Sequence, residues 1–314
     1  MQVLSKSKIG FAMAAVIAAV SLFTTVNAWA SECYYSNDLG LSLSYEEYAY
    51  LSQFMDGKDL DLFTQEEANY LIGNIAEDGV ETETKYIKTE VSADDGTVLS
   101  EIYMSEEEML GELNGTSAAI TDNDGFTVST YAYDPARRYA EIITDTRKLV
   151  LNMYSVAASA KKVSLTCTWL SIPQCKSYDV MGIRVPGYYS DLTIDINGTD
   201  NVVGYQYYDG QKIKYDHSSK NIKKSERGVG VSMNIVDSVS KSLSMNFSVT
   251  FGTGQKTFAA SGSYQHAQKD LSLSKSQKYT IGASGMGGVF KFKSSVESYY
   301  DDAPGLMVVG SIEV

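Results

Sequence analysis

The chain contains two histidines, His217 and His266, and neither lies in a catalytic motif. His217 stands within Asp216-His217-Ser218, which has the residue types of a hydrolytic triad. Consecutive residues cannot face one another as a triad requires, because the three side chains must converge from separate positions. We therefore interpret His217 as a loop residue and His266 as an ordinary strand-end residue. Paired carboxylates for glycoside hydrolysis stay open as an alternative, although spacing alone does not locate them.

Oxygen-bearing side chains suggest one site for a metal ion. Asp195, Asn197 and Asp200 lie within Asp195-Ile196-Asn197-Gly198-Thr199-Asp200, and oxygen ligands of this kind are those that Ca²⁺ prefers. We expect these three residues to be candidate calcium ligands, with the pair Asp301-Asp302 as a similar second candidate. An Asn-Gly turn explains the first stretch equally well. No other cofactor is expected.

The three cysteines leave an odd count. Cys167 and Cys175 are symmetric about Ser171, so a hairpin turning there would place the two sulfur atoms opposite each other. A disulfide between them is one prediction, and two buried free thiols are the alternative, because spacing alone does not establish disulfide geometry. Cys33 would be left unpaired near the start of the mature chain.

Two kinds of side chain could bind a ligand without catalysis. Tyrosines occur in pairs, and because neighbouring strand residues point to opposite faces, one tyrosine of each pair is expected to be exposed. Exposed tyrosines stack on sugars or anchor protein partners, although high β-propensity also explains their abundance. The densest basic cluster could meet an anionic wall polymer or lipid headgroups, or simply be a solvated loop. The candidate ligand-binding residues are Tyr188, Tyr189, Tyr207, Tyr208, Lys220, Lys223, Lys224 and Arg227.

The elements that would position these residues are strands. From Ser242 to Phe251, apolar and small polar residues alternate strictly, which puts every apolar side chain on one strand face. About a dozen similar short runs follow residue 138, with turns at Asp209-Gly210 and Gly252-Thr253-Gly254. The pattern predicts a mainly β protein whose C-terminal domain, 137–314, is an antiparallel β-sandwich of the jelly-roll or Ig-like kind.

The first 30 residues have the form of a bacterial secretory signal peptide. Lys6 and Lys8 precede an apolar run at 9–23, and Ala28-Trp29-Ala30 is a small-x-small cleavage site. The run is shorter than the roughly 20 residues that a spanning helix needs. We therefore expect a secreted, extracellular protein that begins at Ser31, with no transmembrane helix in the mature chain.

Residues 31–136 form an acidic region with a different character. They carry 24 acids against three lysines, a net charge of −21, whereas 137–314 carry +6. Ser44 and Thr64 each precede a Glu by three residues, a pattern typical of helix starts, and Ser105 begins a third such segment. Two runs around Asp94-Asp95-Gly96 predict a β-hairpin. The region is thus predicted to be a small α+β unit in front of the sandwich.

The charge reversal falls at Arg137-Arg138, which is a candidate protease site as well as an ordinary dibasic pair. Because no catalytic motif is present, we predict a secreted, non-enzymatic protein that binds a glycan, wall polymer or protein at a cell surface. The alternative is a membrane-active or pore-forming β effector whose acidic region is a removable pro-segment. With a mature charge of −15, no nucleic-acid partner is expected. The oligomeric state is open.

Overall fold

The computed structural model describes residues 33–55, 57–61, 63–75, 80–92, 97–113, 142–157, 160–185, 202–225, 228–252, 257–281, 289–301 and 305–311. The chain divides into two compact units, Met1–Gln65 and Glu66–Val314. The signal peptide and the dibasic site at Arg137-Arg138 lie outside the described residues.

The smaller unit is built from short elements around a few buried leucines. It contains β1 (Tyr35–Ser36), β2 (Ser42–Leu43), α2 (Tyr45–Leu51) and α3 (Gly57–Leu60). The predicted capping box at the start of α2 is confirmed: the Ser44 hydroxyl accepts from the Glu47 N–H, and the Glu47 carboxylate accepts from the Ser44 N–H. The buried leucines that hold the unit together are Leu41, Leu43, Leu51 and Leu60.

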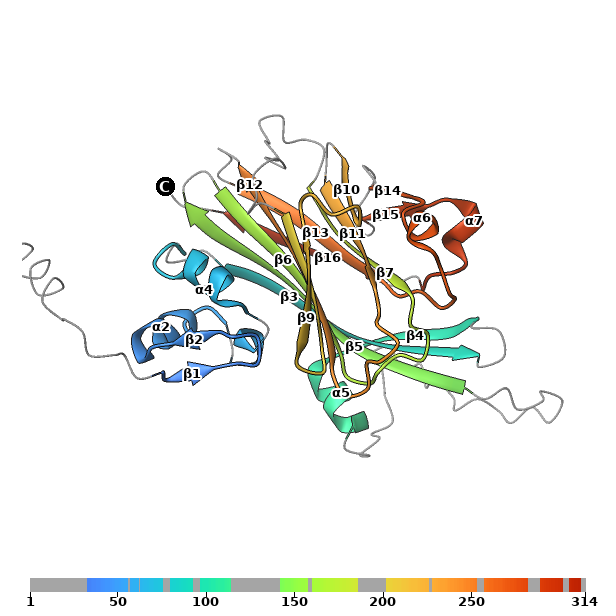
Figure 1. The fold of residues 1–314 in the computed structure, drawn as a ribbon, viewed down its shortest axis with the longest axis horizontal. Coiled ribbons are helices and arrows are strands. Elements are labelled where there is room, and N and C mark those ends of the chain that lie inside the picture. Colours follow the sequence, from blue (N-terminus) through green and yellow to red (C-terminus); the bar gives the residue numbers. More distant parts are fainter. Residues whose placement is uncertain are drawn as a thin grey trace, which may run out of the picture. The chain divides into compact units, whose positions relative to one another are not determined.

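The larger unit contains two antiparallel sheets (Figure 1). The described part of the first sheet has seven strands in the order β4-β3-β5-β6-β12-β8-β9. Their bounds are β3 Val80–Ser92, β4 Val98–Met104, β5 Ile142–Ala157, β6 Ala160–Trp169, β8 Val202–Tyr208, β9 Gln211–Asp216 and β12 Leu243–Gly252.

The second sheet has five described strands in the order β10-β11-β7-β13-β16. They are β7 (Tyr178–Arg184), β10 (Ile222–Ser225), β11 (Gly228–Asn234), β13 (Thr257–Gln265) and β16 (Leu306–Ser311). The small strand pair β14 (Tyr279–Ile281) and β15 (Phe290–Phe292) has its own aromatic cluster. The short helices of the unit are α4 (Gln65–Leu71, whose first residue falls in the smaller unit), α5 (Glu106–Leu113), α6 (Leu273–Ser276) and α7 (Ser294–Glu297).

One hydrophobic core lies between the two sheets, so the larger unit is a β-sandwich. On β12 the residues Leu243, Met245, Phe247, Val249 and Phe251 all enter this core, together with Leu165 of β6 and Val231 of β11. Because side chains alternate along a strand, the intervening Ser, Asn and Thr residues lie on the opposite, outer face of the seven-stranded sheet. The predicted mainly β, antiparallel sandwich is therefore confirmed.

The sandwich takes in part of the predicted acidic region. β3 pairs with β5 along its whole length, from Val80 opposite Tyr154 to Ser92 opposite Ile142. β3 also pairs with β4, as the predicted hairpin requires. The boundary drawn at residue 136 from the charge reversal thus cuts through the seven-stranded sheet, and the compact units divide at Gln65 instead. The net charge of β3 depends on its solvent-facing side chains, whereas its pairing with β5 depends on backbone hydrogen bonds, so the charge did not predict the domain boundary.

Two predicted hairpins have different outcomes. At Asp209-Gly210 the backbone angles φ are 49° and 77°, the positive values that a tight hairpin turn between β8 and β9 needs. By contrast, β12 and β13 do not pair, because β12 lies in the seven-stranded sheet and β13 in the five-stranded one. The chain after Gly252 therefore crosses from one sheet to the other.

None of the helices in the described part of the chain combines the length and hydrophobicity that crossing a bilayer requires.

Candidate functional site

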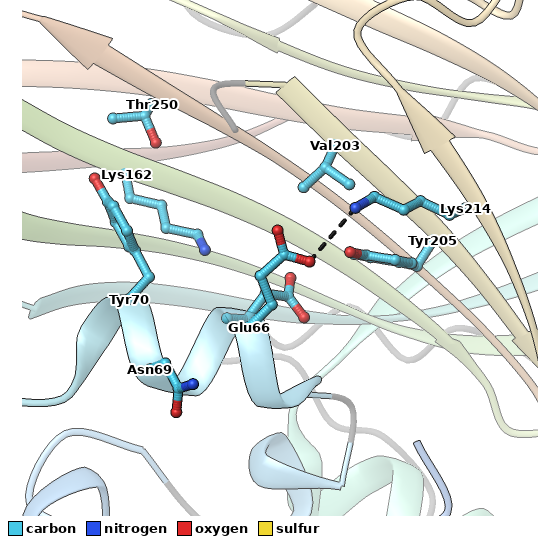
Figure 2. A pocket seen from close by; sticks show the side chains of 9 residues that line it. Glu66, Asn69, Tyr70, Lys162, Val203, Tyr205, Lys214 and Thr250 are labelled. Carbon is cyan, nitrogen blue, oxygen red and sulfur yellow. Dashed lines mark hydrogen bonds and ion pairs between the residues drawn. The ribbon is translucent and has the colours of Figure 1, made fainter. Parts of the chain in front are cut away.

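A pocket of about 300 Å³ lies between α4 and the outer face of the seven-stranded sheet (Figure 2). It gathers two tyrosines, two lysines and two glutamates with three smaller side chains. The lining residues are Glu66, Glu67, Asn69, Tyr70, Lys162, Val203, Tyr205, Lys214 and Thr250. We call it the α4 pocket.

Strand register brings the sheet residues of the α4 pocket together. Lys162 of β6 is directly opposite Thr250 of β12, and Tyr205 of β8 is directly opposite Lys214 of β9. Val203 is two residues before Tyr205 and therefore shares its face. Their strand neighbours point the other way into the core, so the same alternation that builds the sandwich presents this polar and aromatic set outward.

Helix α4 supplies the opposite wall. Ala68 and Leu71 are buried, which fixes the helix by its apolar side, while Glu66 and Glu67 occupy its first turn. Acidic residues are favoured at that end of a helix because the first backbone N–H groups carry partial positive charge. The sequence pattern Thr64 to Glu67 predicted the helix itself but not that Glu66 and Tyr70 would face a sheet.

Charges inside the α4 pocket are paired across it. The Glu66 carboxylate lies 3.4 Å from the Lys214 ammonium, and the Lys162 ammonium lies 5.1 Å from the centre of the Tyr70 ring. Burial lowers the pKa of Lys162, while the nearby carboxylates of Glu67 and Glu66 raise it. Figure 2 shows Tyr70 and Lys162 at one end of the pocket, Tyr205 and Lys214 at the other, and Glu66 between them.

Tyr205 is held rigidly. Its ring stacks on that of Tyr207 with centres 5.6 Å apart and planes 18° apart, and Lys212 and Lys214 lie 5.3 and 5.9 Å from its centre. The Tyr207 hydroxyl is buried with no hydrogen-bond partner among the described residues, and burial raises its pKa. Both side chains are buried, so the stacked rings form a fixed aromatic support beside the polar pocket.

The predicted tyrosine sites come out differently from the expectation of one exposed ring per pair. Tyr207 is buried, and Tyr208 is half-buried against the sandwich core, where its hydroxyl donates to Gln211. Both faces of β8 are covered, because the core lies on one side and Lys212, Tyr205 and α4 lie on the other. Tyr188 and Tyr189 lie outside the described residues.

One residue of the predicted basic patch, Lys223, is engaged in contacts within the fold. Lys223 donates to the backbone carbonyl oxygens of Gln277 (3.0 Å) and Tyr279, and its ammonium lies 4.8 Å from the Tyr279 ring centre. It thus anchors α6 and β14 to β10. Lys220 and Lys224 are exposed, and Arg227 lies outside the described residues.

The metal prediction falls mostly outside the described residues, where Asp195, Asn197 and Asp200 lie. Among the residues that the structure does describe, no group of three His, Cys, Asp or Glu side chains could hold a metal ion. Asp301 binds the Arg147 guanidinium instead. The calcium site at residues 195–200 stays a prediction.

The predicted pairing of Cys167 with Cys175 is not formed, and Cys33, Cys167 and Cys175 are all free thiols. Cys167 lies in the core on β6, which pairs with β5 and β12. The expected hairpin partner does not exist, because the chain after Trp169 leads to β7 in the other sheet. Burial raises the pKa of Cys175 to about 12 and raises that of Cys167 further.

A buried polar network escaped the sequence analysis. The His266 ring nitrogen Nδ1 lies 2.9 Å from the Asp179 carboxylate, and the Tyr264 hydroxyl donates to the same carboxylate. The His266 backbone N–H donates to Asp301, which also binds Arg147. These residues come from β5, β7, β13, the position directly after β13 and the segment after α7, so no local spacing could have revealed the network.

Comparisons with known proteins give no family. No protein-family model matches the chain, and no curated protein matches it. The solved structures that resemble it include two domains of bacterial surface proteins. The KRT10-binding region domain of the pneumococcal serine-rich repeat protein PsrP is 11% identical, with a TM-score of 0.25, over 59% of this chain and 88% of that one. The collagen-binding domain of Erysipelothrix rhusiopathiae surface protein RspB is 8% identical, with a TM-score of 0.24, over 53% and 66%. These TM-scores are too low to assign the ligands of those two domains to this chain.

Proposed function

We propose that this chain is a secreted, non-enzymatic binding protein of a cell surface, and that its α4 pocket holds one sugar ring of a surface glycan. The observation that carries the proposal is the pocket itself, in which two tyrosine rings and four charged side chains converge on one small space. Its secretion rests on the signal-peptide pattern of the first 30 residues.

The size of the α4 pocket favours a small ligand such as a single sugar ring. A volume of about 300 Å³ is at the lower end of what small-molecule sites have. A folded protein partner would need a much larger contact area. A terminal sugar of a longer glycan satisfies both limits, because one ring enters while the remainder stays in solvent.

The chemistry of the lining also suits a sugar. The apolar C–H face of a sugar ring can pack against tyrosine, and Tyr70, an exposed residue at one end of the pocket, provides such a ring. Tyr205 is buried and forms the wall at the other end. Hydroxyl groups on the ring edge need both donors and acceptors. Lys162 and Lys214 donate, Glu66 and Glu67 accept, and Asn69 and Thr250 do both.

The test uses the mature protein, 31–314, on an array of surface glycans and wall polysaccharides, followed by calorimetry on the best binder. We expect Tyr70→Ala and Glu66→Gln each to weaken binding about tenfold or more, since each removes a contact worth about 1.4 kcal/mol. Tyr103→Ala is the matched control, because Tyr103 is an exposed tyrosine of β4 away from the pocket. Equal binding by all variants, or no binding to any glycan, would refute the proposal.

A further inference from the structure

Four tyrosine rings of the smaller unit are linked by three ring contacts. The ring centres of Tyr34 and Tyr45 are 5.0 Å apart with planes at 87°, and Tyr48 lies 5.1 Å from Tyr34 and 5.3 Å from Tyr35. We call Tyr34, Tyr35, Tyr45 and Tyr48 the tyrosine cluster. The contact between Tyr34 and Tyr45 is edge-to-face and the other two are tilted, and aromatic contacts at these distances are favourable, so the rings hold one another in place.

Local structure explains why the cluster forms. Tyr45 and Tyr48 are three residues apart on α2 and therefore lie on one face of the helix. The capping box at Ser44 fixes the first turn of that helix, and with it the position of Tyr45. Tyr34 and Tyr35 arrive from the β1 side, where the Tyr35 hydroxyl donates to the Asp61 carboxylate.

The cluster is at the surface. Tyr34 is 57% exposed and Tyr45 is 64% exposed, the highest values among the large hydrophobic side chains that the structure describes. Tyr35 and Tyr48 are half-buried beneath them. Exposed, preorganised tyrosines are characteristic of protein-binding surfaces, because they add contact area with little loss of side-chain entropy.

Five tyrosine rings elsewhere in the described chain have a lysine over them, and the rings of this cluster do not. An ammonium group lies within 4.8 to 5.9 Å of the ring centre at Tyr70, Tyr86, Tyr205, Tyr279 and Tyr299. No cation of the described side chains lies over Tyr34, Tyr35, Tyr45 or Tyr48. The electron-rich faces of these rings are therefore available to a cation from outside.

The surrounding charge favours the same kind of partner. Residues 33–65 carry six carboxylates against one lysine, Lys58, a net charge of −5. Glu46 is exposed directly beside Tyr45. An anionic ligand would be repelled here, whereas a cation gains both from the ring faces and from the carboxylates.

We propose that the tyrosine cluster is a docking surface for a segment of another protein that is rich in lysine or arginine. Arginine fits best, since its planar guanidinium stacks on aromatic rings and pairs with carboxylates at once. This surface is independent of the α4 pocket, because it uses different residues and is proposed for a cationic ligand instead of a sugar.

The experiment measures binding of the mature protein to a fluorescent arginine-glycine repeat peptide by anisotropy at low salt. Wild-type protein should bind it, and should not bind the peptide in which every arginine is replaced by glutamine. The double variant Tyr34→Ala/Tyr45→Ala should lose at least about fivefold in affinity. Tyr45→Phe should retain most of it, because the ring face stays while the hydroxyl is lost. Raising the salt concentration should weaken binding.

Two control variants locate the binding at the tyrosine cluster. Tyr103→Ala, an exposed tyrosine on β4, should bind as wild type does. Tyr70→Ala should also bind the peptide normally even though it weakens the α4 pocket. Unchanged affinity in Tyr34→Ala/Tyr45→Ala, with its circular dichroism spectrum intact, would overturn the proposal. So would equal binding of the glutamine peptide, or no binding of the arginine peptide at millimolar concentration.

Discussion

The Arg147 guanidinium lies 2.6 Å from the Asp301 carboxylate, and neither side chain is exposed to solvent. Arg147 belongs to β5 in the middle of the seven-stranded sheet, and Asp301 follows α7. Burial opposes the charge of Arg147, but Asp301 and its other anionic neighbours raise its pKa. The Trp169 ring centre lies 5.3 Å from the guanidinium carbon. The ion pair between Arg147 and Asp301 therefore attaches the segment after α7 to the sandwich.

Breaking this pair should be costly. Asp301→Ala leaves the Arg147 charge buried without its partner, so we expect a loss of about 3–5 kcal/mol in the free energy of unfolding. The double variant Arg147→Met/Asp301→Leu should lose less, because the fully buried guanidinium is removed together with its carboxylate and only Glu101, which is partly exposed, loses an ion pair. Urea denaturation measures both. Lys88→Gln, at a less buried pair with Glu90, is the control and should cost less than about 1 kcal/mol. Equal losses in the single and double variants would contradict this account.

The three thiols should remain chemically free. In denaturant without reductant, we expect the secreted protein to react with three equivalents of iodoacetamide, at Cys33, Cys167 and Cys175. In the native state Cys33 should react first, since it is exposed whereas Cys167 is buried. Peptide mass spectrometry counts the adducts. A non-reduced peptide linking Cys167 to Cys175 would show that the predicted disulfide forms after all.

Lys161 should make stability depend on pH in the alkaline range. Burial lowers its pKa to about 8 in the folded protein, against about 10.4 when unfolded. Between these values the unfolded chain binds the proton and the folded one does not, so stability rises with pH. We expect a gain on the order of 1 kcal/mol from pH 8 to 10. Lys161→Met should lack this gain. Identical pH profiles of the two proteins would rule out the effect.

Asp209 should make the folding stability depend on pH in the acidic range. Hydrogen bonds from the backbone N–H groups of Ser242, Lys241 and Ser240 lower its pKa to about 2. The stabilisation is therefore present above pH 4 and is lost as the pH falls through about 2. NMR titration of the carboxyl group checks the pKa. Asp209→Asn, which tolerates the same positive φ, should lose less stability than wild type between pH 4 and 2. A titration midpoint near 4 would contradict the prediction.

Cleavage at Arg137-Arg138 should not release the acidic region. The backbone of β3 is hydrogen-bonded to β5 over thirteen residue pairs, so the two fragments share a sheet. We expect protein nicked there to co-elute as one species in size-exclusion chromatography and to separate only in denaturant. This bears on the pore-forming alternative, which requires that the acidic segment leave. Recovery of a free native fragment beginning at Tyr139 would favour that alternative.

Features that depend on neighbouring residues were predictable. The alternation from Leu243 to Phe251 predicted the strand face that enters the core, and Asp209-Gly210 predicted a turn that needs two positive φ angles. The capping pattern at Ser44 likewise predicted the start of α2. In each case the interaction that causes the feature acts between residues close together in the sequence, so the order of the residues is enough to predict it.

Which strands become neighbours was decided only by the tertiary structure. Charge separated β3 from β5, yet their backbones pair, because hydrogen bonding between strands is indifferent to solvent-facing charge. The same applies to Lys223, which the sequence offered to a ligand and which the fold uses to bind Tyr279. The α4 pocket needs one helix and four strands at once, so its lining became visible only when sheet register had brought Tyr205 opposite Lys214 and within reach of Glu66.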